Sequence, residues 1–161
     1  MKTLMFVIVL FTVLICDCKR HTSLSPMERS SIRNDVQRVL TAMSDSMQRN
    51  GLAGWIPFLH NSPDFQWEFH GTAESYDTLV AQIRREAPRY RSITISWDSV
   101  QVEPLNNNET TLTTRYNESV TDTGGARSII VGTVKSRLER VNGVWKFHLG
   151  HTFVDNDTRT Y

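Results

Sequence analysis

Residues 137–154 read RLERVNGVWKFHLGHTFV and carry the strongest structural signal in the chain. Two runs in which apolar or aromatic residues alternate with polar ones are separated by Asn142-Gly143. An Asn-Gly pair between alternating runs is the strongest short-range signal for a tight β-hairpin. We therefore expect a closing hairpin with strands over 127–140 and 144–154.

More strands are predicted upstream of this hairpin. Segments 92–103 and 109–121 are also rich in β-branched and aromatic residues, and the links LNNN and DTGG are turn sequences. With the hairpin they predict a four-stranded antiparallel meander. A separate strand is expected at 65–71, FQWEFHG, because aromatic and polar residues alternate there.

The N-terminal half predicts helices. SPMERSSIRNDVQRVLTAMSDSMQRNG has a capping box at Ser25 and Glu28, apolar residues at helical spacing and an Asn-Gly stop. The short apolar segment 52–64 is expected to form a brief second helix and a loop, and 74–88 a third helix. The order helix, helix, strand, helix, meander indicates the α+β class.

The first twenty residues, MKTLMFVIVLFTVLICDCKR, carry an apolar run of 13 residues from Leu4 to Cys16. A membrane-spanning helix needs roughly 20 apolar residues, whereas a run of this length is typical of a signal-peptide core. We expect residues 1–17 to be a signal peptide and the protein to be exported, either to a bacterial cell envelope or into the medium. Cys16 or Cys18 resembles the lipid-attachment cysteine of a bacterial lipoprotein, so anchoring and release are alternatives.

The remaining chain has the length of one domain. We assign 18–25 to a tether, 26–155 to the domain and 156–161 to a C-terminal tail. The net charge is only +1 and no basic block is present, which argues against a nucleic-acid partner. The sequence has neither a phosphate-binding glycine loop nor a Cys/His set with metal-ligand spacing, and we expect neither a cofactor nor a metal.

The order of elements resembles the nuclear transport factor 2-like superfamily, which includes ketosteroid isomerases and SnoaL-like polyketide cyclases. The capped first helix, the Trp55–Phe58 segment, WEFHGTAESYDTLVAQI and the closing hairpin carry the resemblance, which covers 26–154. It implies a strongly bent antiparallel or mixed sheet wrapped around about three N-terminal helices. The resulting cone has a pocket at its open end, and relatives often pair through the sheet, so a homodimer is expected.

His148 and His151 invite a metal-site interpretation. They lie three residues apart, and on a regular strand they point to opposite faces, so they cannot share a metal. His151 is expected on the face of Trp145 and Phe147, toward the pocket, unless a bulge at Gly150 changes the alternation. There it is either a general acid or base or a buried hydrogen-bonded imidazole. We expect His148 at the surface.

Other candidates are weaker. Tyr116 and Glu118 share a face of a neighbouring strand and are possible partners of His151, although Glu118 also fits an exposed strand end. His70 ends the first strand, in the region where the resemblance places a proton-shuttling carboxylate. The aromatic residues expected to contact a ligand are Trp55, Phe58, Trp67 and Trp97.

These observations leave three hypotheses. The first is an exported domain that binds a small, mostly apolar or aromatic molecule in a hydrophobic cone. The second is an isomerase, cyclase or dehydratase-like enzyme that needs no cofactor and uses His151 as general acid or base. The third is a protein-interaction module with a vestigial pocket. The first helix lacks the tyrosine of the isomerase oxyanion hole, which argues against a ketosteroid isomerase.

Overall fold

Helix α1 (Pro26–Asn50) begins at the predicted capping box. The Ser25 hydroxyl accepts a hydrogen bond from the Glu28 N–H (3.2 Å), and the Glu28 carboxylate accepts one from the Ser25 N–H (2.7 Å). The apolar stripe is buried as its spacing predicts; its members are Ile32, Val36, Leu40, Met43 and Met47. The computed structural model describes residues 23–155 and 159–160.

The predicted signal peptide (1–17), both cysteines and most of the tether and tail lie outside the described residues. In the part of the chain that is described, no helix is long and apolar enough to cross a membrane.

The described residues form two α-helices rather than about three. The segment after α1 is a 3₁₀ helix, η1 (Gly51–Phe58), because it is short and contains Pro57, which cannot donate a backbone hydrogen bond. η1 folds back tightly on α1: a Cβ at Gly54 would lie 2.4 Å from the Ser46 carbonyl oxygen. The second α-helix, α2 (Tyr76–Glu86), leads through the 3₁₀ turn η2 (Ala87–Arg89) into the meander.

The strands form one mixed sheet. Their bounds are β1 Gln66–Phe69, β2 Thr72–Glu74, β3 Tyr90–Asn106, β4 Glu109–Asp122, β5 Arg127–Val141 and β6 Val144–Val154. They lie in the order β2-β1-β6-β5-β4-β3, and β7 (Arg159–Thr160) pairs with β5 off this path. The antiparallel meander β3 to β6 is confirmed, and the sheet is mixed because β1 runs parallel to β6.

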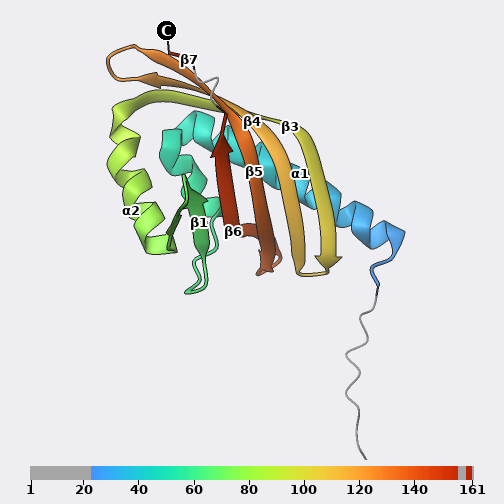
Figure 1. Cartoon of the computed structure of the whole chain (residues 1–161). Helices are drawn as coiled ribbons and strands as arrows, with labels where there is room; N and C mark the ends of the chain where they lie inside the picture. Colours follow the sequence, from blue (N-terminus) through green and yellow to red (C-terminus); the bar gives the residue numbers. More distant parts are fainter. Residues whose placement is uncertain (1–22, 156–158, 161) are drawn as a thin grey trace, which may run out of the picture.

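The sheet curves, and α1 lies across one of its faces while α2 stands beside β1 (Figure 1). Interruptions in the strand pairing accompany the curvature. The register of β3 against β4 shifts between Asp98 and Gln101, where Ser99 has φ 52°. A second shift lies opposite Arg137 and Leu138 of β5, where β6 carries one extra residue, His148.

The hydrophobic core fills the space between the helices and the concave face of the sheet. Its largest fully buried side chains are Trp67, Trp145, Phe65 and Phe147. Trp97 joins the layers, because its indole N–H on β3 reaches the Leu40 carbonyl oxygen (3.1 Å) and the Ser44 hydroxyl (2.9 Å) of α1. The helices therefore hold the sheet from one side, and the cavity described below lies within this layer.

Candidate functional site

A cavity of about 160 Å³ opens between the concave face of the sheet, α1 and η1. Its walls are almost entirely apolar and aromatic. The residues that line it are Met43, Met47, Leu52, Trp55, Trp67, Phe69, Ile95, Trp97, Tyr116, Glu118, Val134, Phe147 and Thr152.

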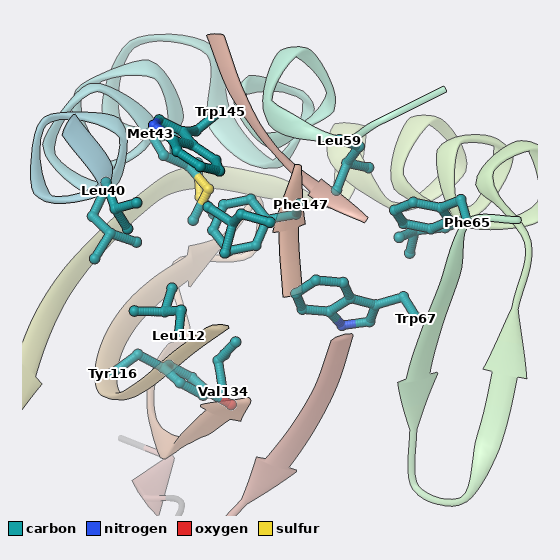
Figure 2. Packing of buried hydrophobic residues seen from close by; sticks show 14 of the residues in the cluster. Leu40, Met43, Leu59, Phe65, Trp67, Leu112, Tyr116, Val134, Trp145 and Phe147 are labelled. Atoms are coloured by element: carbon teal, nitrogen blue, oxygen red, sulfur yellow. The ribbon is translucent and has the colours of Figure 1, made fainter. Parts of the chain in front are cut away.

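The lining residues divide into a floor and a rim. In Figure 2 the rings of Trp67, Phe147 and Tyr116 and the side chains of Met43 and Val134 lie around a common space. These five are buried, as is Thr152, and form the floor. Met47 is also buried and belongs to the floor. The remaining lining residues, Trp55 and Glu118 among them, are partly exposed and form the rim. A ligand can therefore enter past an indole and a carboxyl group.

The tryptophans of the cavity differ in how their indole N–H groups are used. Trp67 donates to the Thr152 hydroxyl (3.0 Å), and the N–H of Trp97 is bound to α1. Trp55 packs edge-on against Trp67, with ring centroids 5.1 Å apart. Its Nε1 is buried and has no hydrogen-bond partner among the described residues. A buried donor without a partner is costly, and Trp55 is one of the residues that line the cavity.

Two glycines make room for the aromatic floor. A Cβ at Gly150 would lie 2.2 Å from the Trp67 ring, and a Cβ at Gly132 would lie 2.7 Å from the Tyr116 hydroxyl. Each ring therefore lies directly over the backbone of a neighbouring strand. Glycine is required at both positions for this close approach.

Glu118 is the single acidic residue among the described residues that line the cavity. Burial raises the pKa of its carboxyl to about 7, so near neutral pH it is present both as carboxylate and as acid. Tyr116 lies two residues away on the same face of β4. Burial, with the nearby charges of Glu118 and Asp155, raises the pKa of its hydroxyl to about 12, which keeps it protonated. The pair supplies one titrating group and one stable hydrogen-bond donor.

The prediction that His151 faces the pocket is wrong. The extra residue in β6 is His148, two positions before the proposed bulge at Gly150, and it reverses the alternation beyond it. Thr152 consequently lines the cavity, whereas His151 stacks on Phe153 (3.7 Å between ring centroids). The Nδ1 of His151 lies 3.3 Å from a carboxylate oxygen of Glu68, rather than against Tyr116 or Glu118.

The other sequence predictions have mixed outcomes. Trp55, Trp67 and Trp97 line the cavity, but Phe58 lines a separate surface hollow beside Trp145. His70 is exposed in the turn between β1 and β2, with φ 49°, outside the cavity. His148 was expected at the surface and is instead buried, with 7% of its surface exposed.

The model of the SnoaL-like domain family matches residues 28–149. The chain belongs to this family. A search of the curated proteins found no match to this SnoaL-like domain.

Solved structures share the fold of the SnoaL-like domain at low sequence identity. A scytalone dehydratase-like protein from Novosphingobium aromaticivorans has a TM-score of 0.72 at 12% identity, covering 82% of this chain and 89% of its own. A hexachlorocyclohexane dehydrochlorinase from Novosphingobium barchaimii has a TM-score of 0.66 at 16% identity, covering 85% and 94%. A nuclear transport factor 2-like superfamily protein from Salmonella enterica has a TM-score of 0.67 at 10% identity, covering 80% and 94%. The nuclear transport factor 2-like fold is thus confirmed.

Sequence reasoning missed Thr152 and the two methionines of the floor. Met43 and Met47 belong to the predicted apolar stripe of α1, but the stripe does not tell which of its members border a cavity. On a regular strand Thr152 would lie on the face opposite Trp145 and Phe147, outside the cavity. Gly150 was the available signal, since an isolated glycine within a strand often marks a bulge or a close approach.

Proposed function

We propose that this SnoaL-like domain binds a small, largely apolar molecule about the size of a single ring in the cavity. The observation that carries the proposal is the cavity itself, a mostly apolar space with a few convergent polar groups. An apolar cavity of about 150 Å³ in another protein holds benzene, which sets the scale for the buried part of the ligand.

Two polar groups of the cavity lining, one at the rim and one in the floor, define the ligand further. Trp55 offers an indole N–H without a partner in the described part of the chain, and Tyr116 offers a protonated hydroxyl. Both favour a ligand that carries a hydrogen-bond acceptor, such as a carbonyl, hydroxyl or halogen substituent on a ring. A vestigial pocket is expected to be filled by side chains, and the cavity argues against that alternative.

Matched variants test the binding. Titration of the protein with p-cresol and with toluene, followed by tryptophan fluorescence and ligand-observed NMR, is expected to show saturable binding, tighter for p-cresol. V134F fills the floor and is expected to weaken binding at least tenfold, whereas V144F, at an exposed position, leaves it unchanged. Equal binding by native protein and V134F would contradict the proposal.

A second candidate function is proton transfer by Glu118, favoured by a carboxyl with a pKa of about 7 at the edge of an apolar cavity. A general base works best when its pKa lies near the operating pH, and groups of this kind gather at functional sites. As carboxylate, Glu118 would take a proton from a carbon next to a carbonyl or to a leaving group. The electron pair then forms an enolate or a carbon–carbon double bond, and Tyr116 or Trp55 stabilises the negative charge on the oxygen or leaving group.

This reaction can be followed without the natural substrate. Cyclohexanone in D₂O exchanges its α-hydrogens when a base removes them, and NMR measures the rate. The native protein is expected to accelerate the exchange, and E118Q to lose about 10²-fold or more of that acceleration. E68Q, which removes a carboxylate outside the cavity, is the control. No acceleration by native protein, or full acceleration by E118Q, would exclude this function while leaving the binding proposal standing.

A further inference from the structure

A second polar cluster lies away from the cavity, where β5, β6 and the segment after η1 meet. Leu59 forms an isolated parallel bridge with Phe147, and the His60 N–H donates to the Phe147 carbonyl oxygen (2.8 Å). His60 is thereby held beside His148, and Glu139 of β5 lies next to both. The segment after η1 and the two strands of the closing hairpin each contribute one side chain.

The bulge in β6 creates this arrangement. Phe147 pairs with Leu138 and Leu149 pairs with Arg137, so His148 is the residue without a partner in β5. A bulge redirects the side chain of its extra residue. Here His148 is turned toward Glu139, and its Nε2 lies 3.6 Å from a carboxylate oxygen.

The ligand-type atoms of the cluster converge. The His60 Nδ1 lies 3.2 Å from the other Glu139 oxygen, the imidazole centroids are 5.1 Å apart, and one ligand atom from each residue lies within 4.8 Å of the others. Ligand atoms placed about 2.0–2.1 Å from a tetrahedral Zn²⁺ are about 3.3 Å apart. The observed distances to Glu139 match that spacing with small side-chain adjustments.

Hydrogen bonding within the described residues leaves the imidazoles poorly satisfied. His148 is more than nine-tenths buried, and its Nδ1 has no hydrogen-bond partner there. The Nδ1 of His60 is also buried and makes no well-aligned hydrogen bond, although it lies in contact with the Glu139 carboxylate (3.2 Å). The neighbouring cations are directed elsewhere. Arg137 binds Glu109 on β4, and Lys146 donates to the Pro57 carbonyl oxygen. Glu139 thus faces the two histidines, and its negative charge is available to a metal cation.

We propose that His60, Glu139 and His148 form a binding site for Zn²⁺ or a similar divalent transition metal. Imidazole nitrogen and carboxylate oxygen are preferred ligands of Zn²⁺, which takes three protein ligands and a water in open sites. The side chains of His60 and Glu139 are 20% and 27% exposed, so the fourth position faces solvent. The bound metal clamps the end of η1 to β5 and β6. Because Trp55 of η1 and Phe147 of β6 both line the cavity, the clamp also braces its wall.

A background variant removes the other histidines and the cysteines of the chain, which could bind the metal elsewhere. It is the untagged full chain with every remaining histidine changed to Gln and both cysteines to Ser, so that His60 and His148 are the only imidazoles. The substitutions are C16S, C18S, H21Q, H70Q and H151Q. After treatment with chelator and dialysis, calorimetric titration with ZnCl₂ is expected to give one equivalent, and Co²⁺ is expected to give the visible absorption of a four-coordinate site.

Ligand variants in this background decide the assignment. H60Q, E139Q and H148Q are each expected to weaken Zn²⁺ binding at least tenfold, and E68Q to leave it unchanged. Zn²⁺ is also expected to raise the Tm of the background protein by several degrees, because it binds only the folded state. Absence of stoichiometric binding, or binding that H60Q and E139Q do not weaken, would overturn the proposal. H60Q lies on an irregular, partly exposed segment, so it keeps the test decisive if H148Q does not fold.

Discussion

Glu118 and Glu139 show two ways of placing a carboxylate on the same sheet. Glu118 faces the apolar cavity, makes no ion pair among the described residues, and has its pKa raised by burial. Glu139 lies outside that cavity with an imidazole on each side. The carboxyl group of Glu118 can therefore contact a ligand in the cavity. The carboxylate of Glu139 instead lies between two imidazoles that can bind a cation together with it.

The largest effect is expected from G150A, which disturbs the cavity side. The added Cβ would overlap the Trp67 ring, with contacts of 2.2–2.6 Å, so the ring or the strand must shift. We expect a loss of about 2–4 kcal/mol in unfolding free energy, measured by urea denaturation. H151A, the next residue on the outer face, is the control. A G150A midpoint equal to that of the native protein would contradict the packing described.

The next effect concerns the charge of Glu118. Its folded-state pKa of about 7 lies above its ordinary value of 4.5, so the folded state binds the proton more tightly than the unfolded state. The resulting stability is present below about pH 4.5 and is lost as the pH rises through about 7. E118Q is therefore expected to be about 2 kcal/mol more stable than native protein at pH 8, after allowance for partial exposure, and equally stable at pH 4.5.

Urea denaturation of both proteins across this pH range measures the difference, and E68Q serves as the control at the surface. A difference between native protein and E118Q that does not change between pH 4.5 and 8 would show that Glu118 is not buried as described.

A smaller effect is expected from T152V, which removes the hydroxyl that accepts the Trp67 hydrogen bond while keeping the shape. The buried indole N–H then has no partner, at a cost of about 1–2 kcal/mol. Thermal unfolding measures the loss. In a double-mutant cycle, the double variant W67F/T152V is expected to lose less stability than the sum of the two single variants, because either substitution alone already removes the hydrogen bond. Additive single effects would show that the two groups do not interact.

The smallest effect is expected on the outer face. His151 and Glu68 are both about one-third exposed, and an ion pair of this kind contributes about 0.5 kcal/mol or less. H151Q and E68Q should each shift the Tm by no more than about 2 °C. A loss of stability in H151Q comparable to that of G150A would show that His151 contributes more to the folded state than an exposed ion pair does.

Much of the fold could be predicted because its signals are local. The capping box of α1, the Asn142-Gly143 turn and the strand alternation each depend on neighbouring residues, and all are confirmed. Tyr116 and Glu118 were grouped correctly because β4 is regular along that stretch. The predicted strand faces of His151 and Thr152 were wrong, because the face of each side chain depends on which residues of β5 and β6 pair with each other. One extra residue there changes the face of every side chain that follows, and the alternation of apolar and polar residues does not report it.

The parallel pairing of β1 with β6 has a consequence for how the protein is made. Trp67 and Thr152 are 85 positions apart, and their hydrogen bond joins the first strand of the sheet to the last strand of the meander. Contacts of such long sequence separation form slowly, since a large loop must close before they contribute. The meander can assemble from neighbouring hairpins, but β1 must wait until β6 has left the ribosome. The cavity, which Trp67 and Thr152 both line, is therefore completed only after β6 has been synthesised.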